Sequence, residues 1–150
     1  MIKVMFICHG NICRSPMAEF LMKDFLKKRG ETDFFVASCA TSREELGNGV
    51  HYGTRQILSR LGISCNEKRA VQLTASDYDA YDYFVCMDEN NRRNALRIFG
   101  SDPAKKISLL MDYTPTPRDV ADPWYTGNFE QTYKDITAGI DGLYLHVKSR

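Results

Sequence analysis

The sequence lacks the features of a membrane protein or an exported protein. Within its 150 residues no apolar run approaches the ~20 residues that a helix needs to cross a bilayer. The first ten residues, MIKVMFICHG, contain one lysine and a short apolar run, without the longer apolar region and small-residue cleavage site of a signal peptide. We therefore expect a cytoplasmic protein that has no membrane partner.

A strong charge of one sign and closely paired cysteines are missing as well. Lysine and arginine total 20 and aspartate and glutamate total 19, so the formal net charge is +1 and nucleic acid is not expected as a partner. The five cysteines are scattered without C-x-x-C spacing, which argues against a zinc site and a secreted disulfide framework. Free thiols and no bound metal are the expectation for a reducing compartment.

What the sequence contains is an alternation of apolar, strand-like runs with amphipathic, helix-like stretches. Strands are expected at residues 2–7, 33–40, 81–88 and 106–111. Helical periodicity is found at residues 15–29, 53–63, 89–100 and 129–147. This alternation predicts one domain over residues 1–150 with a three-layer α/β/α architecture, in which a central four-stranded parallel sheet has flavodoxin-like or Rossmann-like topology.

Two of these helices carry recognisable boundary signals. Ser15 is typical of an N-cap and Pro16 of the first helical position, so the first helix is expected to begin there. In the second helix Leu58 and Leu61 are expected to face the core, and Gly62 is expected to end the helix.

The stretch CHGNICRS, residues 8–15, follows the first strand, where parallel α/β folds bind their ligands. The peptide N–H groups between such a strand and the next helix can curl around one anion. Gly10 is expected to let the backbone turn where a side chain would obstruct it, and Asn11 to adopt left-handed geometry and pin the loop. Arg14 supplies a planar fork that matches two oxygens of a phosphate. The sequence thus predicts a phosphate-binding loop.

Cys8 lies at the base of this predicted loop, where the field that attracts phosphate also favours a thiolate. Ser15 could donate a hydrogen bond to that thiolate, and a bound phosphate would present its phosphorus to an ionised nucleophile. His9 is expected at the rim of the pocket and not in a dyad with Cys8, because neighbouring side chains diverge when their N–H groups converge. The absence of G-K-[ST] excludes a Walker-type loop.

With these residues in place, CHGNICRS resembles the C-x5-R-[ST] loop of low-molecular-weight protein tyrosine phosphatases, which also lies near the N-terminus. YDYFVCMDENN resembles the third strand and following turn of that family, and DPWYTGNFEQTY resembles its general-acid loop. The resemblance implies a cysteine-dependent phosphatase that needs neither metal nor cofactor. The phosphate-binding residues that it implies are Cys8, His9, Gly10, Asn11, Ile12, Cys13, Arg14 and Ser15.

The resemblance makes Asp122 the general acid, and the chemistry agrees with that role. The leaving phenolate needs a proton, and the carboxylate that remains can activate water for the second step. Asp119 is the nearest competitor, but it lacks the flanking motif. Cys13 resembles the second loop cysteine of the family, which implies a reversible disulfide with Cys8 that protects the nucleophile from further oxidation. Ser38 and Asp88 resemble supporting residues behind the loop.

The expected substrate pocket is built from Ile12, Glu44, Trp124 and Tyr125. Trp124 and Tyr125 resemble the aromatic wall that flanks a phosphotyrosine ring in the family. Where vertebrate members often carry an aromatic residue after the second strand, this chain has SREELGN, so Glu44 or Glu45 replaces it. We hypothesise that these acids favour peptides with basic residues near the phosphotyrosine.

A histidine that some members use to hold the loop asparagine has no counterpart. Lys68 or Arg69 lies near its place, so we expect Asn11 to be held differently.

Three other functions deserve comparison with phosphotyrosine hydrolysis. Arsenate reductases share the loop but need two further cysteines, and only Cys86 lies in the relevant region. Protein-arginine phosphatases carry a threonine at the place of Ile12, whose apolar side chain instead suits an aromatic ring. A phosphopeptide-binding module would be expected to lack Cys8 or Asp122. The expected partners are phosphotyrosine-containing proteins or peptides and phosphate-like oxyanions, bound by a monomer or a weakly self-associating dimer.

Overall fold

The computed structural model describes all 150 residues and has a four-stranded parallel sheet at its centre, in the order β2-β1-β3-β4. Its strands are β1 (Ile2–Cys8), β2 (Phe34–Ala40), β3 (Tyr83–Cys86) and β4 (Ile107–Leu109). In the register of the sheet, Val4 of β1 lies opposite Val36 on one side and Tyr83 on the other. The order corresponds to the flavodoxin-like topology, in which ligands bind where the strand order reverses, beside the end of β1.

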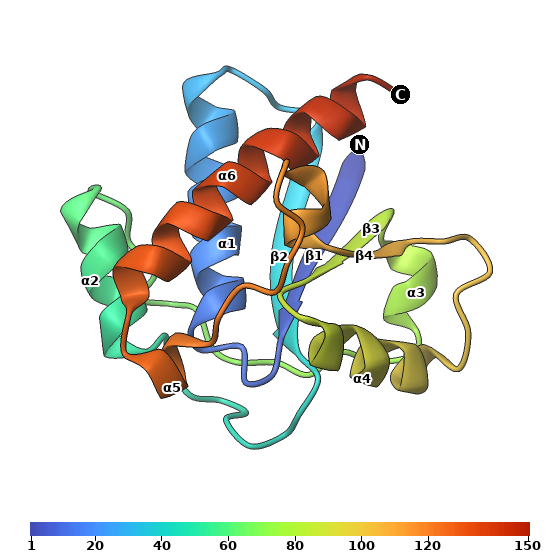
Figure 1. Ribbon diagram of the computed structural model, residues 1–150, viewed down its shortest axis with the longest axis horizontal. Helices are drawn as coiled ribbons and strands as arrows, with labels where there is room; N and C mark the ends of the chain where they lie inside the picture. The colour runs from blue at the N-terminus through green and yellow to red at the C-terminus, as the bar shows by residue number, and fades with distance from the viewer.

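Helices cover both faces of this sheet, so the predicted three-layer α/β/α fold is confirmed. The helices are α1 (Arg14–Lys28), α2 (Tyr52–Arg60), α3 (Asp77–Ala80), α4 (Glu89–Phe99), the 3-10 helix η1 (Leu110–Tyr113), α5 (Pro123–Thr126) and α6 (Phe129–Lys148). Figure 1 shows α1, α2 and α6 on one side of the sheet and α3 and α4 on the other. None of these helices is both long and apolar enough to span a membrane.

The alternation of side chains along β1 explains the two layers. Val4 and Phe6 point into the larger core cluster, which contains residues of α1, α2 and α6. Met5 and Ile7 point into a smaller cluster with Ala95 of α4 on the opposite face. Because successive side chains of a strand face opposite sides, a strand with consecutive apolar residues needs helices packed on both faces of its sheet. The hydrophobic run of β1 therefore accounts for its central place in the sheet.

Four expected boundaries were wrong. The fourth strand ends at Leu109 and not at residue 111, because η1 begins at Leu110. Helix α1 begins at Arg14 with Cys13 as its N-cap, so Ser15 lies within the first turn and uses its hydroxyl on Cys8 instead. Leu61 was expected to face the core but is 43% exposed, because α2 ends at Arg60; Gly62, whose φ is +74°, turns the chain away after the helix, as expected. The third strand ends at Cys86, since Asp88 is the N-cap of α4.

Candidate active site

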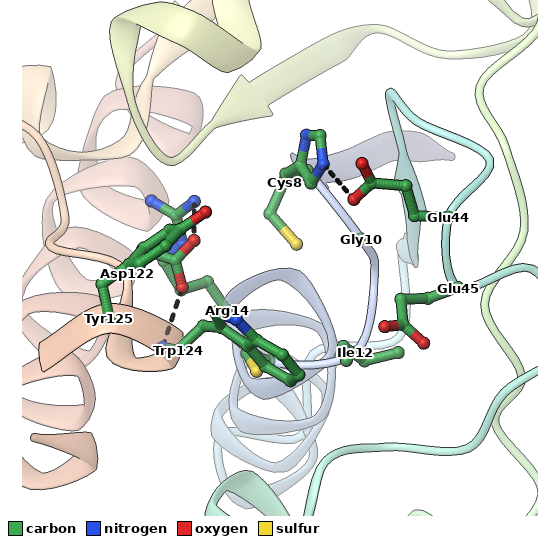
Figure 2. A pocket seen from close by; sticks show the side chains of 11 residues that line it. Cys8, Gly10, Ile12, Arg14, Glu44, Glu45, Asp122, Trp124 and Tyr125 are labelled. Atoms are coloured by element: carbon green, nitrogen blue, oxygen red, sulfur yellow. Dashed lines mark hydrogen bonds and ion pairs between the residues drawn. The ribbon is translucent and has the colours of Figure 1, made fainter. Parts of the chain in front are cut away.

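A pocket of about 120 Å³ opens at the carboxyl end of β1. Figure 2 shows the loop after β1 at its floor, with the segment after β2 on one side and the segment around α5 on the other. Its eleven lining residues come from these three segments: Cys8, His9, Gly10, Ile12, Cys13, Arg14, Glu44, Glu45, Asp122, Trp124 and Tyr125. Every residue expected for the substrate pocket and for catalysis thus lies around one cavity.

The floor of the pocket holds Cys8 in a set of hydrogen-bond donors. Its Sγ accepts a hydrogen bond from the backbone N–H of Asn11 at 3.3 Å and lies 2.9 Å from Ser15 Oγ. Asn11 has a φ of 57°, which is the left-handed geometry expected from the sequence. The expectation for Gly10 was wrong, because a Cβ there would make only ordinary contacts at 3.4 Å or more and its φ is not positive. The turn is therefore made by Asn11.

The side chain of Asn11 ties the loop to neighbouring segments. Its Nδ2 donates to Ser15 Oγ at 2.8 Å and to Ser38 Oγ at 2.9 Å, while its Oδ1 accepts from the N–H of Val71 at 3.1 Å. Lys68 lies behind this group and donates to the carbonyl of Ser38 at 2.9 Å. Asn11 is thus held by Ser38 and a backbone N–H. Of the two basic residues considered, Lys68 contacts Ser38 behind the loop, whereas Arg69 donates to the carbonyls of residues 66 and 68.

Arg14 is buried, and its guanidinium is fixed from three sides. Nη1 donates to Asp88 Oδ2 at 2.8 Å and to the carbonyl of Val120 at 2.7 Å, and Nη2 lies 3.4 Å from Asp122 Oδ2. Burial opposes the charge, but the negative charges of Cys8, Asp88 and Asp122 raise the pKa of Arg14 above its ordinary value. The site therefore contains a permanent, oriented cation. Val120 was missed by the sequence analysis because it acts through its carbonyl, which no side-chain pattern reveals.

Asp122 lies at the mouth of the pocket as the N-cap of α5. Its Oδ1 accepts from the N–H of Trp124 at 3.0 Å, and Pro123 occupies the first helical position. The competing carboxylate, Asp119, lies outside the pocket and accepts from the N–H of Glu89 at 3.1 Å. Of the two candidates, only Asp122 can reach a group bound above Cys8.

Aromatic side chains form one rim of the pocket. Trp124 and Tyr125 are 56% and 84% exposed. His51, the N-cap of α2, stacks on Phe129 with ring centroids 5.2 Å apart and meets Trp124 edge-on at 5.6 Å. It therefore supports the aromatic rim. No sequence signal identified it, because both partners belong to a distant part of the chain.

The opposite rim is acidic, as Figure 2 shows. Glu44 Oε2 lies 2.7 Å from His9 Nε2, so His9 is at the rim and does not contact the thiol. Glu45 accepts a hydrogen bond from the amide of Asn48 at 2.5 Å. Glu45 therefore has only an uncharged amide as its partner, whereas Glu44 is paired with the imidazole of His9.

The remaining cysteines differ from Cys8 in their surroundings. Burial, together with the negative charges of Cys8 and Asp122, raises the pKa of Cys13 to about 12, so Cys13 is a neutral thiol at pH 7. Cys39, Cys65 and Cys86 are buried among apolar residues of the core. No three His, Cys, Asp or Glu side chains are grouped so that they could hold a metal ion.

Comparison with known proteins identifies the family. The model of the low molecular weight phosphotyrosine protein phosphatase family matches residues 3–150. The low molecular weight protein-tyrosine-phosphatase YfkJ of Bacillus subtilis is 38% identical over 99% of this chain and 97% of its own length. The protein-tyrosine-phosphatase PtpA of Staphylococcus epidermidis is 38% identical over 98% of this chain and 94% of its own.

Solved structures agree with this assignment. The crystal structure of YfkJ superimposes with a TM-score of 0.95 and covers 99% of this chain and 96% of its own. The Drosophila arginine phosphatase DARP superimposes with a TM-score of 0.89 at 27% identity, with 98% of both chains covered. Since the family model spans nearly the whole sequence and close relatives share more than a third of their residues, this chain belongs to the low molecular weight phosphotyrosine protein phosphatase family.

Proposed function

We propose that this protein is a protein tyrosine phosphatase that hydrolyses phosphotyrosine through a phosphocysteine intermediate on Cys8, without a metal or a cofactor. The observation that carries the proposal is that one small pocket holds a buried thiol at its floor, a charged guanidinium beside it and a carboxyl group at its mouth. The names of the relatives, which are tyrosine phosphatases, support the same substrate class.

In the first step the Cys8 thiolate attacks phosphorus. An S–P bond forms, the bond between phosphorus and the tyrosine oxygen breaks, and protonated Asp122 gives its proton to the leaving oxygen. The loop N–H groups and Arg14 stabilise the equatorial oxygens, where charge is spread in the transition state. Asp88 and the Val120 carbonyl support this role, since they hold the guanidinium in one orientation.

In the second step Asp122 acts as the base. Its carboxylate removes a proton from water, the water oxygen attacks phosphorus, and the S–P bond breaks to return the thiolate and release phosphate. Ser15 Oγ is 2.9 Å from Cys8 Sγ and can donate to the departing thiolate. The same side chains thus serve both steps, with the proton of Asp122 first lost and then regained.

The walls of the pocket favour an aromatic ring over a guanidinium. Ile12 lines the pocket with an apolar side chain, and Trp124 and Tyr125 add aromatic side chains to the lining. An arginine side chain is better served by polar groups that accept its N–H donors. Arginine phosphatase activity remains a candidate because the similar structure DARP is an arginine phosphatase. It ranks second because the apolar and aromatic walls of this pocket suit an aromatic ring better.

The acidic rim leads to a proposal about the residues that flank the phosphotyrosine. Glu44 and Glu45 line the side of the pocket opposite the aromatic rim, so a basic residue next to the phosphotyrosine would meet a negative charge. Surface pairs of this kind contribute up to about 1 kcal/mol, or about fivefold in kcat/KM. Glu45→Ala should reduce the preference for basic over acidic phosphopeptides more than Glu44→Ala, because His9 already pairs with Glu44. An unchanged preference in both variants would contradict the hypothesis.

Cys13 is proposed to protect the nucleophile from oxidation. Peroxide converts the Cys8 thiolate to a sulfenic acid; Cys13 then attacks that sulfur, an S–S bond forms and water leaves with the thiol proton. The raised pKa of Cys13 supports this order of events, since the neutral thiol is oxidised more slowly than a thiolate.

The location and partners follow from the same chemistry. A thiol nucleophile beside a second thiol stays active in a reducing compartment, which supports a cytoplasmic location. The partners that we propose are phosphotyrosine proteins or peptides, together with phosphate as a competing ligand. A monomer or weak dimer is the proposed state, and sedimentation at several concentrations measures it.

An assay panel tests the proposal. Purified protein is incubated with 4-nitrophenyl phosphate, phosphotyrosine, phosphoserine and phosphoarginine, and released phosphate is measured. Wild type should hydrolyse the two aryl esters, Cys8→Ser should hydrolyse none, and Cys65→Ser should behave as wild type because Cys65 is a buried cysteine outside the pocket. Release of phosphate from phosphoarginine alone would assign the second candidate function instead.

A further inference from the structure

We propose that the outer edge of β2 is a docking site for an extended, acidic segment of a partner protein, which pairs with this edge as an additional strand. β2 is the edge strand in the order β2-β1-β3-β4, and Figure 1 shows it beside α1. A strand at the edge of a sheet presents unpaired N–H and C=O groups to an extended chain that can reach them. The edge lies outside the active-site pocket, so the inference does not depend on the proposed function.

Only part of this edge is open. At the end nearer the pocket, the segment 68–73 covers it: this segment accepts a hydrogen bond from the Ala40 N–H at 2.7 Å and donates one to the carbonyl of Ser38 at 2.9 Å. No segment covers the other end, since the one bridge outside the named strands is also formed by Ala40. The open part of the edge therefore runs from Phe34 to Val36.

The hydrogen-bond pattern of the sheet shows which backbone groups of the open part are free. The Ile2 N–H donates to the carbonyl of Asp33 at 2.9 Å, so the carbonyl of Asp33 points toward β1. Because backbone groups of successive residues in a strand point to opposite sides, those of Phe34 and Val36 point away from β1. Neither residue forms a backbone hydrogen bond outside the sheet. The N–H and C=O groups of both residues are thus available to an added strand.

A groove of about 360 Å³ lies between the open edge and α1. Leu26, Phe34 and Val36 give its lining an apolar part, and Lys23 and Lys27 of α1 also line it. The side chain of Lys23 is 46% exposed, and Lys27 is exposed as well. Since the side chains of a strand alternate between the two faces of its sheet, every second side chain of an added strand would enter this groove.

The charges around the groove favour an acidic occupant. Lys27 forms no ion pair. Lys23 and Lys68 share a single carboxylate, that of Glu19. The one carboxylate that lines the groove, Glu31, is already paired with a lysine at 2.9 Å. The groove therefore has an excess of positive charge, and a glutamate side chain in the added strand would meet Lys23 and Lys27.

The opposite face of the sheet determines the alternate positions of the partner. The side chain of Phe35 is 46% exposed there, so an apolar residue of the added strand would cover it. The predicted segment thus alternates acidic and apolar residues. A second copy of this chain does not fit, because β2 itself has the sequence FFVASCA and offers no acidic residue to the lysines. Antiparallel pairing of two β2 strands would also bring the lysines of both α1 helices to the same face.

The test uses two fluorescein-labelled peptides of about nine residues, in which valine alternates with glutamate or with lysine. Fluorescence anisotropy measures their binding to the full chain, with inorganic phosphate in excess so that carboxylates do not bind in the pocket. The glutamate peptide should bind at least about tenfold more tightly than the lysine peptide.

Three variants locate the site of binding. Lys27→Glu should weaken binding of the glutamate peptide about fivefold or more. Arg93→Glu is the matched control, because it reverses the charge of an exposed residue on α4, and it should leave the affinity unchanged. Val36→Pro should abolish binding, since it removes an N–H that points away from β1 and leaves the ladder with β1 intact.

Hydrogen exchange of the backbone amides, measured by NMR, shows whether the peptide binds as a strand. Exchange at Phe34 and Val36 in wild type should slow at least about tenfold with the glutamate peptide, so the test holds even if Val36→Pro fails to fold. Equal affinity for the two peptides, no binding, unprotected amides at these residues or unchanged binding by Lys27→Glu overturns the proposal. A dimer in sedimentation that Val36→Pro makes monomeric also overturns it, because a second copy would then occupy the edge.

Discussion

Replacing Asp122 by asparagine removes the group that donates the proton but keeps the geometry of its loop. The bond from the Trp124 N–H to Asp122 Oδ1 can be kept by the asparagine carbonyl, and asparagine caps a helix as well as aspartate does. The other carboxylate oxygen makes only a long contact of 3.4 Å with Arg14. The unfolding midpoint of the variant should therefore lie within about 4 °C of wild type, because less than ~1 kcal/mol of stability is at stake.

The expected loss is in catalysis and depends on the leaving group. Removal of a general acid lowers kcat/KM, which reports the first step, by roughly 10²–10⁴, and this corresponds to about 3–5 kcal/mol in the barrier. This full loss is expected for phosphotyrosine, whose phenolate is a strong base. For 4-nitrophenyl phosphate, whose phenolate leaves without a proton, the loss in kcat/KM should be at most about tenfold, while kcat falls for both substrates because the second step loses its base. Steady-state kinetics on the two substrates measure the ratio directly.

Asp119→Asn is the matched control for this prediction, because Asp119 lies three residues away and outside the pocket. It should have wild-type kcat and kcat/KM on both substrates. If Asp122→Asn lost the same factor in kcat/KM on both substrates, proton transfer to the leaving group would not be its role. If Asp119→Asn showed the leaving-group dependence instead, the assignment of the acid would be wrong.

Three other outcomes are expected. Cys13→Ser should be inactivated by hydrogen peroxide beyond recovery with dithiothreitol, whereas wild type recovers through the Cys8–Cys13 disulfide; equal recovery would contradict the protective role. Ile12→Thr should lower the kcat/KM ratio of phosphotyrosine to phosphoarginine by about tenfold, since apolar contact worth ~1–1.5 kcal/mol is lost; an unchanged ratio would mean that Ile12 does not select the ring. Gly142→Ala should lower the free energy of unfolding in urea by ~1–3 kcal/mol, because the added Cβ would overlap the backbone of η1. Gly49→Ala is the control and should be nearly neutral, because its Cβ would meet only a side chain at 3.5 Å.

The fold was predictable where the signal is local. The strand β1 is apolar at most positions, and α6 repeats its apolar residues over 20 residues, so both were located within one or two residues. The short helices α3, α5 and η1 have four residues each and were not predicted, because one turn is too short to show a period. The exposure of Leu61 depends on where the chain turns after α2, which tertiary packing decides.

The candidate site was predictable where chemistry is concentrated in a short motif. Cys8, Arg14 and Asp122 were named from two such motifs, and the pocket brings them together. Val120 and His51 were missed for different reasons. Val120 contributes a carbonyl, which any residue could supply, and His51 acts through ring contacts with Trp124 and Phe129. Contacts between distant segments give these two residues their roles, and a single sequence does not reveal such contacts.

The most direct test of the central claim is to trap the covalent intermediate. Wild type is mixed with 4-nitrophenyl phosphate, quenched in acid during the first turnover and digested, and the peptides are examined by mass spectrometry. The account predicts one phosphoryl group on the peptide that contains Cys8, retained in Cys13→Ser and absent from Cys8→Ser. A phosphoryl group on another residue, such as His9, or phosphate release with no covalent intermediate under conditions that trap a known phosphocysteine, would contradict it.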